Sequence, residues 1–409
     1  MKKEATIELL ENPERDRVHE DAPQVVPRNQ ADQYVYVRDC LRELPNFKST
    51  SLHKLRRISR ELGLYRVWYK DESTRFDIGS FKALGGAYGV FTALADVVRV
   101  RTGKAIRRPK ELLSLRQRSM SETITVCCAS DGNHGRAVAW AARLFGCRSV
   151  VYIPDACSGV REAAIAAEDA QIVRVHGTYE LALSRAITDA DQRGWLLVSD
   201  TAFEGYEQVP QQIMLAYQVL VEEVVEELQP NRLPTHIFVQ AGAGGLAAAL
   251  CAFLWERMGT RRPVLVVVES RSAACLFRSA AARSPVSVPG PHLTVMSGLA
   301  CGKASTLAWR ILRRGADFFI SMDDSWTVIA MRHLATRESL AIFAGESGAA
   351  GLGALMGVCT IPHLRAQVRL SGNSSVLLVG TEGATDPERY RRFVGFAPER
   401  IGNQEHAHL

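Results

Sequence analysis

Short apolar runs alternate with longer helical patterns along most of the chain, from about residue 66 onward. Runs that predict buried strands include YRVWYKD, TITVCCAS, RSVVYIP, QIVRVHG, THIFVQAG, PVLVVVES and SSVLLVGTEG. The segments that predict helices are 82–98, 134–145, 159–168, 178–193, 208–228, 244–257 and 272–282. Strands that alternate with helices in this way predict an α/β fold, with mostly parallel sheets covered by helices on both faces.

The ends of the chain lack this rhythm. Residues 1–50 are polar and contain scattered prolines, so we expect an extended arm that wraps the core. The last residues include HAHL, which is more typical of a tail than of a metal site. A chain of 409 residues is long for one domain and comfortable for two.

Charge and composition exclude several classes of protein. The net charge is +6, from 50 basic and 44 acidic residues, which is far from a polybasic nucleic-acid binder. The basic stretch 99–122 contains no aromatic residue, so we expect a solvated surface insertion there rather than a nucleic-acid site. The apolar stretch 237–255 divides into a strand, a glycine turn and a helix, which indicates the interior of a soluble protein and no membrane partner.

Cysteine usage bears on the cellular compartment and on metals. The nine cysteines include no CxxC pair, and their number is odd. Reduced, mostly buried thiols in a cytoplasmic protein fit this pattern better than a disulfide framework or a zinc site, so we expect no metal. The N-terminus has no apolar segment of the kind found in secretory signals.

The segment DIGSFKALGGAYG places Lys82 at the start of an apolar helix. Desolvation should remove the charge of a lysine there, unless chemistry consumes its amine, as in a Schiff base with an aldehyde cofactor. The alternative is a lysine whose stem packs while its ammonium group reaches water.

Two further glycine turns separate a strand from a helix. In ASDGNHG, Asp131 and Asn133 lie on the turn, where they could be ordinary helix caps or could face a ligand. In QAGAGGL, Gly242, Gly244 and Gly245 precede a helix whose free amide groups and dipole would suit a phosphate. The loop lacks the features of a dinucleotide fingerprint and of a nucleoside-triphosphate loop.

A phosphate, an aldehyde and a polar ring substituent on one ligand would satisfy all three segments, and pyridoxal 5'-phosphate has these groups. The motifs SFKALGGA, SDGNHGRAVAWAA and GAGGL resemble the fold-type II enzymes that use this cofactor, the tryptophan synthase β family. More narrowly, DTAFEGYEQVP, MSGLACGKAS, GESGAAG and TEGATDPERY are similar to diaminopropionate ammonia-lyases. The motifs span residues 75–390.

The resemblance implies a division of labour among the site residues. Lys82 would be the Schiff-base lysine and a base near Cα, Asn133 would bond the ring oxygen, and the hydroxyl of Thr381 would face the pyridine nitrogen. The phosphate would be held by the backbone of Gly242, Ala243, Gly244, Gly245 and Leu246. The alternative for Thr381 is an ordinary turn threonine.

Two carboxylates distinguish the narrower resemblance. Asp131 could take the Cα proton from the face opposite Lys82, which would let one enzyme process D and L substrates, or it could bind the second ammonium group of the substrate. Glu346 could contact substrate or the cofactor ring, or it could simply interact with the dipole of the helix that it precedes.

The resemblance implies a carbon–nitrogen lyase that converts D- and L-2,3-diaminopropionate to pyruvate and two ammonia by α,β-elimination. The alternatives are a serine/threonine dehydratase-like enzyme, a β-replacement enzyme acting on another β-substituted amino acid, and a catalytically idle cofactor-binding protein. The resemblance also implies a homodimer with the cofactor in an interdomain cleft. The small domain would comprise residues 85–199, and the large domain residues 1–84 and 200–409.

Overall fold

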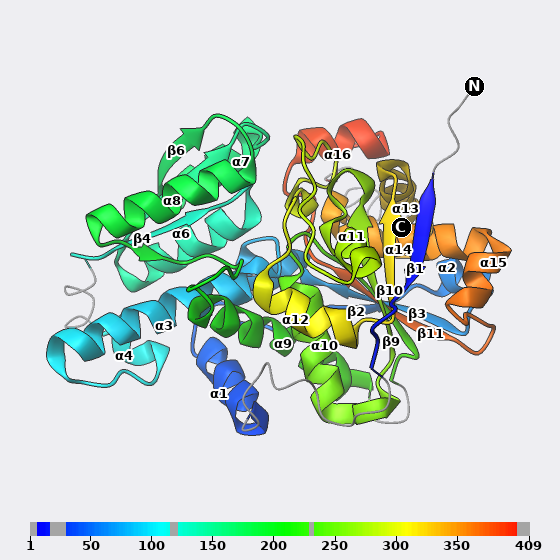
Figure 1. Ribbon diagram of the computed structural model, residues 1–409, viewed down its shortest axis with the longest axis horizontal. Helices are drawn as coiled ribbons and strands as arrows, with labels where there is room; N and C mark the ends of the chain where they lie inside the picture. The colour runs from blue at the N-terminus through cyan, green and yellow to red at the C-terminus, as the bar shows by residue number, and fades with distance from the viewer. Residues whose placement is uncertain (1–5, 17–29, 115–121, 229–232, 399–409) are drawn as a thin grey trace, which may run out of the picture.

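The chain folds around two separate sheets with helices on both faces (Figure 1). The structure is a computed structural model that describes residues 6–16, 30–114, 122–228 and 233–398. The predicted α/β class is confirmed by these two sheets. The C-terminal HAHL segment lies outside the described residues.

The larger sheet has seven strands in the order β1-β10-β9-β8-β11-β3-β2. Their bounds are β1 Ile7–Glu11, β10 Phe318–Met322, β9 Val264–Ser270, β8 His236–Gln240, β11 Ser375–Gly380, β3 Arg66–Asp71 and β2 Ser51–Lys54. The five inner strands run parallel, and the edge strands β1 and β2 pair antiparallel to their neighbours. The sheet is therefore mostly parallel, as the alternating sequence pattern predicts.

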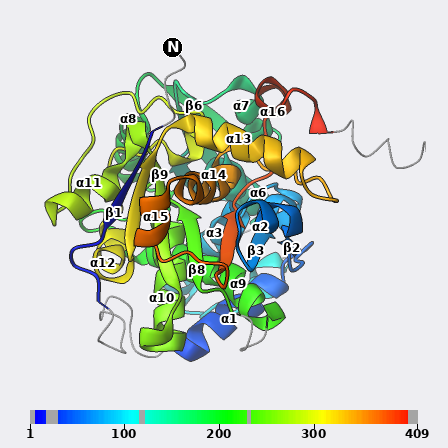
Figure 2. The same ribbon diagram turned by 90° about the vertical axis from the view of Figure 1, so that its right-hand side faces the viewer.

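Alternate side chains of the inner strands pack into two different layers of the core. Ile237 and Val239 of β8 pack with one group of helices, while Phe238 packs with the other. The first layer contains α9 (Gln208–Leu228), α10 (Gly245–Met258) and α12 (Thr306–Gly315), and the second contains α13 (Asp324–Thr336) and α14 (Glu346–Thr360) (Figure 2). This twofold alternation explains why the strands read as continuous apolar runs: both faces are buried.

The smaller sheet has four parallel strands in the order β6-β5-β4-β7. Their bounds are β6 Gln171–Val175, β5 Arg148–Pro154, β4 Thr125–Ala129 and β7 Leu196–Leu197. The helices packed around this sheet are α6 (Asn133–Phe145), α7 (Gly159–Ala166) and α8 (Tyr179–Arg193). All four strands lie within residues 85–199, and all seven strands of the larger sheet lie outside that range. The placement of the strands supports the proposed domain boundaries.

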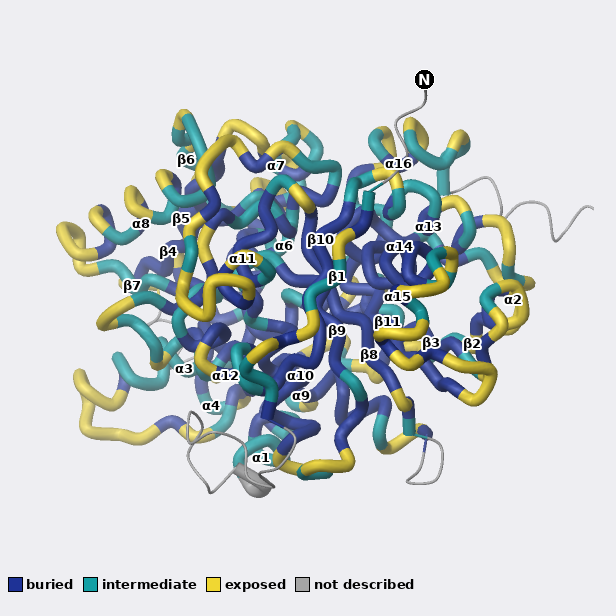
Figure 3. The backbone as a smooth tube through the Cα atoms, turned by 45° about the vertical axis from the view of Figure 1, so that its right-hand side comes forward, coloured by how far each residue is buried: buried dark blue, intermediate teal, exposed yellow. Residues whose placement is uncertain are grey.

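Helix α3 (Lys82–Thr102) lies between α6 and α9 and is buried along its first half. Glycines permit this close approach: a Cβ atom would lie 2.6 Å from the Tyr217 ring at Gly85, and 2.7 Å from Ala137 Cβ at Gly86. In the described part of the chain, α3 is the helix long and apolar enough to cross a membrane, but it is a largely buried core helix here. Figure 3 shows the same contrast between buried central elements and the exposed rim.

Two regions differ from the sequence-based expectation. The arm predicted for residues 1–50 contains strand β1 and helix α1 (Gln30–Arg42), because Val37, Cys40 and Leu41 bury a short apolar face. The basic stretch 99–122 begins inside α3 and includes α4 (Pro109–Leu113), so it is only partly a loop; residues 115–121 lie outside the described chain.

Shorter elements complete the described fold. The remaining helices are α2 (Arg56–Glu61), α11 (Cys275–Ala282), α15 (Pro362–Gln367) and α16 (Pro387–Val394). Four 3₁₀ segments occupy Glu72–Asp77, Gly259–Arg261, Arg271–Ala273 and Ser297–Leu299. The helix predicted over 272–282 therefore begins later, at Cys275.

Candidate active site

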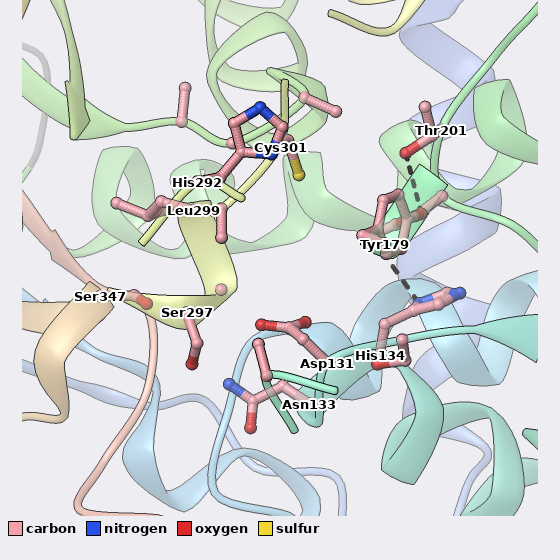
Figure 4. Close-up of a pocket in the computed structure, with 18 of the residues that line it drawn as sticks. Asp131, Asn133, His134, Tyr179, Thr201, His292, Ser297, Leu299, Cys301 and Ser347 are labelled. Carbon is pink, nitrogen blue, oxygen red and sulfur yellow. Dashed lines mark hydrogen bonds and ion pairs between the residues drawn. The ribbon is translucent and has the colours of Figure 1, made fainter. Parts of the chain in front are cut away.

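A cavity of about 470 Å³ lies where the carboxyl ends of strands from both sheets face each other (Figure 4). Its volume is in the range of small-molecule sites, and the ends of parallel strands are where open α/β sheets bind ligands. The cavity is lined by the following predicted site residues: Lys82, Asp131, Asn133, Gly242, Ala243, Gly244, Gly245, Leu246 and Thr381. Residues from the start of α3, from two glycine turns and from the end of β11 are thus brought together.

Lys82 forms an ion pair with Asp200, which follows strand β7. Burial alone would lower the pKa of the Lys82 amine, but Asp200, together with Tyr217 and Asp131, outweighs burial and holds that pKa above its usual value. The same pair, with nearby His134, holds the pKa of Asp200 below its usual range despite burial. Desolvation therefore does not remove the charge of this lysine in the chain alone, because a carboxylate compensates it. The other branch of the expectation, that chemistry consumes the amine, stays a prediction.

His134 stands behind this pair at the start of α6. Its Nε2 lies 2.8 Å from the Val198 carbonyl oxygen, and its Nδ1 lies 3.9 Å from Asp200 Oδ2. Burial lowers the pKa of this imidazole. A neutral ring that donates from Nε2 to the carbonyl leaves the Nδ1 lone pair facing Asp200.

The third glycine turn leaves its backbone amide groups open to the cavity. In the described chain, the amides of Gly242, Ala243, Gly244 and Gly245 donate to no backbone or side-chain acceptor. A Cβ atom at Gly242 would lie 3.0 Å from Cys301 Sγ, and Gly244 has φ +97°, a conformation that favours glycine. Orphan amides at the start of α10 are the arrangement that binds a phosphate.

Asp131 enters the cavity from the second glycine turn, and its neighbour behind the turn is Arg161 of α7. Asp131 Oδ2 lies 3.8 Å from Arg161 Nη1 and has no hydrogen-bond partner among the described residues. Burial raises the pKa of Asp131, while Arg161 and Lys82 oppose that rise. The carboxylate is thus positioned toward the cavity with its charge supported from behind.

Asn133 and Thr381 each contact a residue for which the sequence suggested no role. The Asn133 amide donates to the buried carboxylate of Glu382, whose other oxygen accepts from the Ser347 amide at 2.9 Å. The Thr381 hydroxyl lies 2.9 Å from Gln240 Nε2. Glu382 follows Thr381 directly and lines the cavity beside it.

Glu346 lies one layer behind the cavity and is absent from its described lining. It is the first residue of α14 and is ion-paired with Arg389, at 3.0 Å between Nε and Oε1, and with Arg161, at 3.7 Å between Nη2 and Oε2. Burial and the neighbouring Glu382 raise the pKa of Glu346 to about 7. The lining does not support the hypothesis of a substrate contact, and the helix-start interpretation fits the geometry better.

All nine cysteines are free thiols, and seven of them are buried. Among the described residues, no group of three or more histidine, cysteine, aspartate or glutamate side chains is arranged to hold a metal ion. The polar groups that line the cavity are amides, hydroxyls, carboxylates, the Lys82 amine, the imidazoles of His134 and His292, and the Cys301 thiol.

Comparison with known proteins agrees with this lining. Residues 44–382 match the family described as "Pyridoxal-phosphate dependent enzyme". The chain is 37% identical over 366 residues to the diaminopropionate ammonia-lyase of Salmonella typhimurium, covering 86% of this chain and 89% of that protein. The chain belongs to the diaminopropionate ammonia-lyase family of pyridoxal-phosphate dependent enzymes.

Solved structures give the same assignment. Diaminopropionate ammonia-lyase from Escherichia coli, in complex with an aminoacrylate-PLP azomethine reaction intermediate, superposes with a TM-score of 0.84 at 32% identity, covering 95% of this chain and 97% of that one. A threonine deaminase isoform from Solanum lycopersicum has a TM-score of 0.69 at 16% identity, which shows the shared fold alone. The predicted fold type II is thereby confirmed.

The cofactor of this family member is pyridoxal 5'-phosphate, and the residues present fit it. The orphan amides between Gly242 and Gly245 suit its phosphate, and Lys82 supplies a primary amine to its aldehyde. Thr381 offers a neutral hydroxyl where a carboxylate would instead favour a protonated ring nitrogen. The specific roles of Lys82, Asn133 and Thr381 toward the cofactor remain predictions.

Three cavity residues of this lyase-family member were missed by sequence reasoning. Asp200 and Glu382 lie in the motifs DTAFEGYEQVP and TEGATDPERY, three residues after the end of β7 and two residues after the end of β11, which is a usable signal. Gln240 ends β8 in the same way. Arg161 gave no signal, because it lies inside a short amphipathic helix and reaches the site only through the fold.

Proposed function

We propose that this chain catalyses the α,β-elimination of 2,3-diaminopropionate, in both its D and its L form, to pyruvate and two ammonia. The observation that carries this proposal is the pair of candidate bases in one cavity: Lys82 from the start of α3, and Asp131 from the turn after β4. The identity of 35–37% to two curated diaminopropionate ammonia-lyases supports the choice of substrate.

When bound, pyridoxal 5'-phosphate supplies an electron-withdrawing ring that acidifies the Cα–H bond of an attached amino acid. The task left to the chain is to accept that proton on either face of Cα. As a neutral amine, Lys82 serves one face, and the ionised Asp131 serves the other. Departure of the β-amine, followed by hydrolysis, yields pyruvate and two ammonia for each water consumed.

Asp200 keeps the proton of Lys82 inside the cavity in this scheme. As an ammonium group, Lys82 is paired with Asp200, so the proton remains beside the reacting atoms rather than escaping to solvent. Because the cavity is partly enclosed, these charged groups interact more strongly than they would in water.

The test is pyruvate release from each enantiomer separately, with wild type and with Asp131→Asn. We expect both enantiomers to react and the substitution to remove turnover of the D form while sparing the L form. If neither enantiomer reacts while L-serine or L-threonine does, the proposal fails and the chain is a dehydratase. Asp155→Asn, at an exposed position on the cavity rim, is the matched control.

We also infer a cytoplasmic homodimer, with residues 85–199 as the small domain and residues 1–84 and 200–409 as the large one. The inference of a homodimer rests on the family resemblance, and light scattering during gel filtration tests it. The free thiols support a reducing compartment. The two separate sheets support the domain division, and limited proteolysis near residues 84 and 199 tests it.

A further inference from the structure

Arg161 is a buried cation that the proposed mechanism leaves unused. It lies in the first turn of α7 and is about 4% exposed. Its stem packs under the turn that carries Asp131, because a Cβ atom at Gly132 would lie 3.0 Å from Arg161 Cδ. A side chain in this place can affect Asp131 without touching substrate.

The guanidinium group of Arg161 faces both halves of the molecule. Its Nη1 lies 3.8 Å from Asp131 Oδ2 and donates to the Ser297 hydroxyl. Its Nη2 lies 3.7 Å from Glu346 Oε2 and 4.0 Å from Glu382 Oε2. Asp131 and Arg161 belong to the part built on the small sheet, whereas the other three residues belong to the part built on the large sheet.

Several polar atoms of this cluster are buried without a hydrogen bond in the described structure. They include Arg161 Nε, Arg161 Nη2, Asp131 Oδ2 and Glu346 Oε1, with Ser347 Oγ on the residue next to Glu346. Buried polar atoms are costly to leave unpaired, so such groups usually acquire partners in the working state. The separations of 3.7–4.0 Å are close enough for a small approach of the two halves to turn these ion pairs into hydrogen bonds.

We propose that Arg161 is a positioning residue that keeps the Asp131 carboxylate charged and directed into the cavity, and that it links this base to the large-sheet half of the molecule. The inference rests on the proposed function, in which Asp131 accepts the Cα proton of the D substrate. Arg161 itself touches neither the cavity nor the reacting atoms.

The surrounding charges predict the direction in which loss of Arg161 would shift the pKa of Asp131. Burial raises the pKa of Asp131; Arg161 is the largest opposing charge, followed by Lys82, and Glu382 raises the pKa further. The other titratable groups that interact electrostatically with Asp131 are Cys157, Tyr179 and Cys301. Loss of Arg161 would therefore raise the pKa of Asp131 and leave less of the base ionised at neutral pH.

The experiment compares Arg161→Met and Arg161→Lys with wild type as holoenzymes, by measuring kcat/KM against pH for each enantiomer. In Arg161→Met we expect the acid limb of the D profile to move up by about one pH unit or more, and D turnover at neutral pH to fall about tenfold. The L profile should keep its acid limb, because Asp131 is not the base for the L substrate in this scheme. Arg161→Lys should restore part of the D profile, because it returns the charge.

Arg389→Met is the matched control, because Arg389 also pairs with Glu346 but forms no ion pair with Asp131 in the described structure. It should leave the acid limb of the D profile in place. Equal losses for both enantiomers in Arg161→Met, with an unchanged acid limb, would mean a purely structural role and overturn the proposal.

A second measurement keeps the test independent of turnover. Thermal unfolding of wild type, Arg161→Met, Asp131→Asn and the double variant forms a cycle. We expect the double variant to lose less stability than the sum of the single losses, since Asp131→Asn removes a carboxylate that Arg161→Met leaves unpaired. Additive losses of stability would mean that Arg161 and Asp131 do not interact, and they would overturn the proposal. If wild type consumes neither enantiomer, the proposed function fails, while this cycle still decides whether the pair is coupled.

Discussion

The two candidate bases of the cavity are supported in different ways. Lys82 is in direct hydrogen-bonded contact with Asp200, and each partner stabilises the charged form of the other. Asp131 stands 3.8 Å from Arg161, and both have buried atoms without hydrogen-bond partners in the described structure. One side of the cavity is a closed pair, and the other is an open cluster shared between the two halves of the molecule.

This difference predicts that substitutions will affect turnover of the L form and of the D form unequally. The Lys82 pair is strong locally, so substitutions away from it should leave L turnover intact. The Asp131 cluster divides one guanidinium group among three carboxylates, Asp131, Glu346 and Glu382, so changes at several positions should alter D turnover.

The largest effect is expected from removing the lysine common to both enantiomers. Lys82→Ala should reduce pyruvate release from D- and L-2,3-diaminopropionate by about a thousandfold or more, because the cofactor's anchor and one base disappear together. Lys303→Ala, at an exposed position, should change neither rate. Turnover of the D form within tenfold of wild type in Lys82→Ala would show that Asp131 acts without the lysine.

Asp200→Asn should separate the two sides of the cavity. Asp200 raises the pKa of Lys82, so its loss lowers that pKa, and the neutral amine then persists to lower pH. The acid limb of kcat for the L form, which reports the substrate-bound enzyme with a free Lys82 amine, should therefore move to lower pH, while the level of L turnover falls about tenfold because the amine is no longer held. The exposed Asp191→Asn is the control. An L profile that moves upward would contradict the pairing.

The sequence positions of several site residues, close to predicted strand ends, were enough to predict that they would meet in one site. Lys82, Asp131 and Thr381 follow or precede a strand or a glycine turn, and parallel strands bring such positions to one edge. Arg161 was not foreseeable, because its role depends on how the turn at Gly132 packs over its stem. The edge strand β1 was missed because Ile7–Glu11 carries only a short apolar pattern, and its partner β10 lies about 310 residues away.

The charge of Lys82 shows a second limit of sequence reasoning. Desolvation was the correct largest effect, yet it was opposed by a carboxylate 118 residues away in the sequence. A single segment predicts how buried a group will be better than it predicts which distant charge will face it.

Gly244→Ala should reduce turnover of the D form and of the L form equally. Gly244 has φ +97°, and a Cβ there would lie 3.1 Å from Leu276 Cδ1 and 3.2 Å from Ala308 Cβ. We expect weaker cofactor binding, measured by fluorescence titration, with D and L turnover reduced in the same proportion. Gly103→Ala is the matched control, because Gly103 has φ +70° but open space surrounds it. This substitution should cost about 1 kcal/mol of stability without weakening cofactor binding. Unequal losses of D and L turnover would place the turn on one side only.

Glu346→Gln should give the smallest effect, and it acts on the Asp131 side alone. Because the folded chain holds the pKa of Glu346 at about 7, above its ordinary 4.5, the folded state binds a proton more tightly than the unfolded state. This group therefore makes stability fall as pH rises between those two values, and the amide should flatten that part of the curve. Thermal unfolding between about pH 4.5 and pH 7 measures it, with the exposed Glu388→Gln as control.

The same substitution has a kinetic consequence that sharpens the comparison. Because Glu346 is mostly protonated below pH 7, the amide removes little charge in the acid range, where Arg161 is already shared mainly between Asp131 and Glu382. The acid limbs of both the D and the L profile should therefore stay in place, in contrast to the movement of the D limb in Arg161→Met. Movement of both profiles together would mean that the two sides of the cavity share one electrostatic network, and the distinction between a closed pair and an open cluster would be wrong.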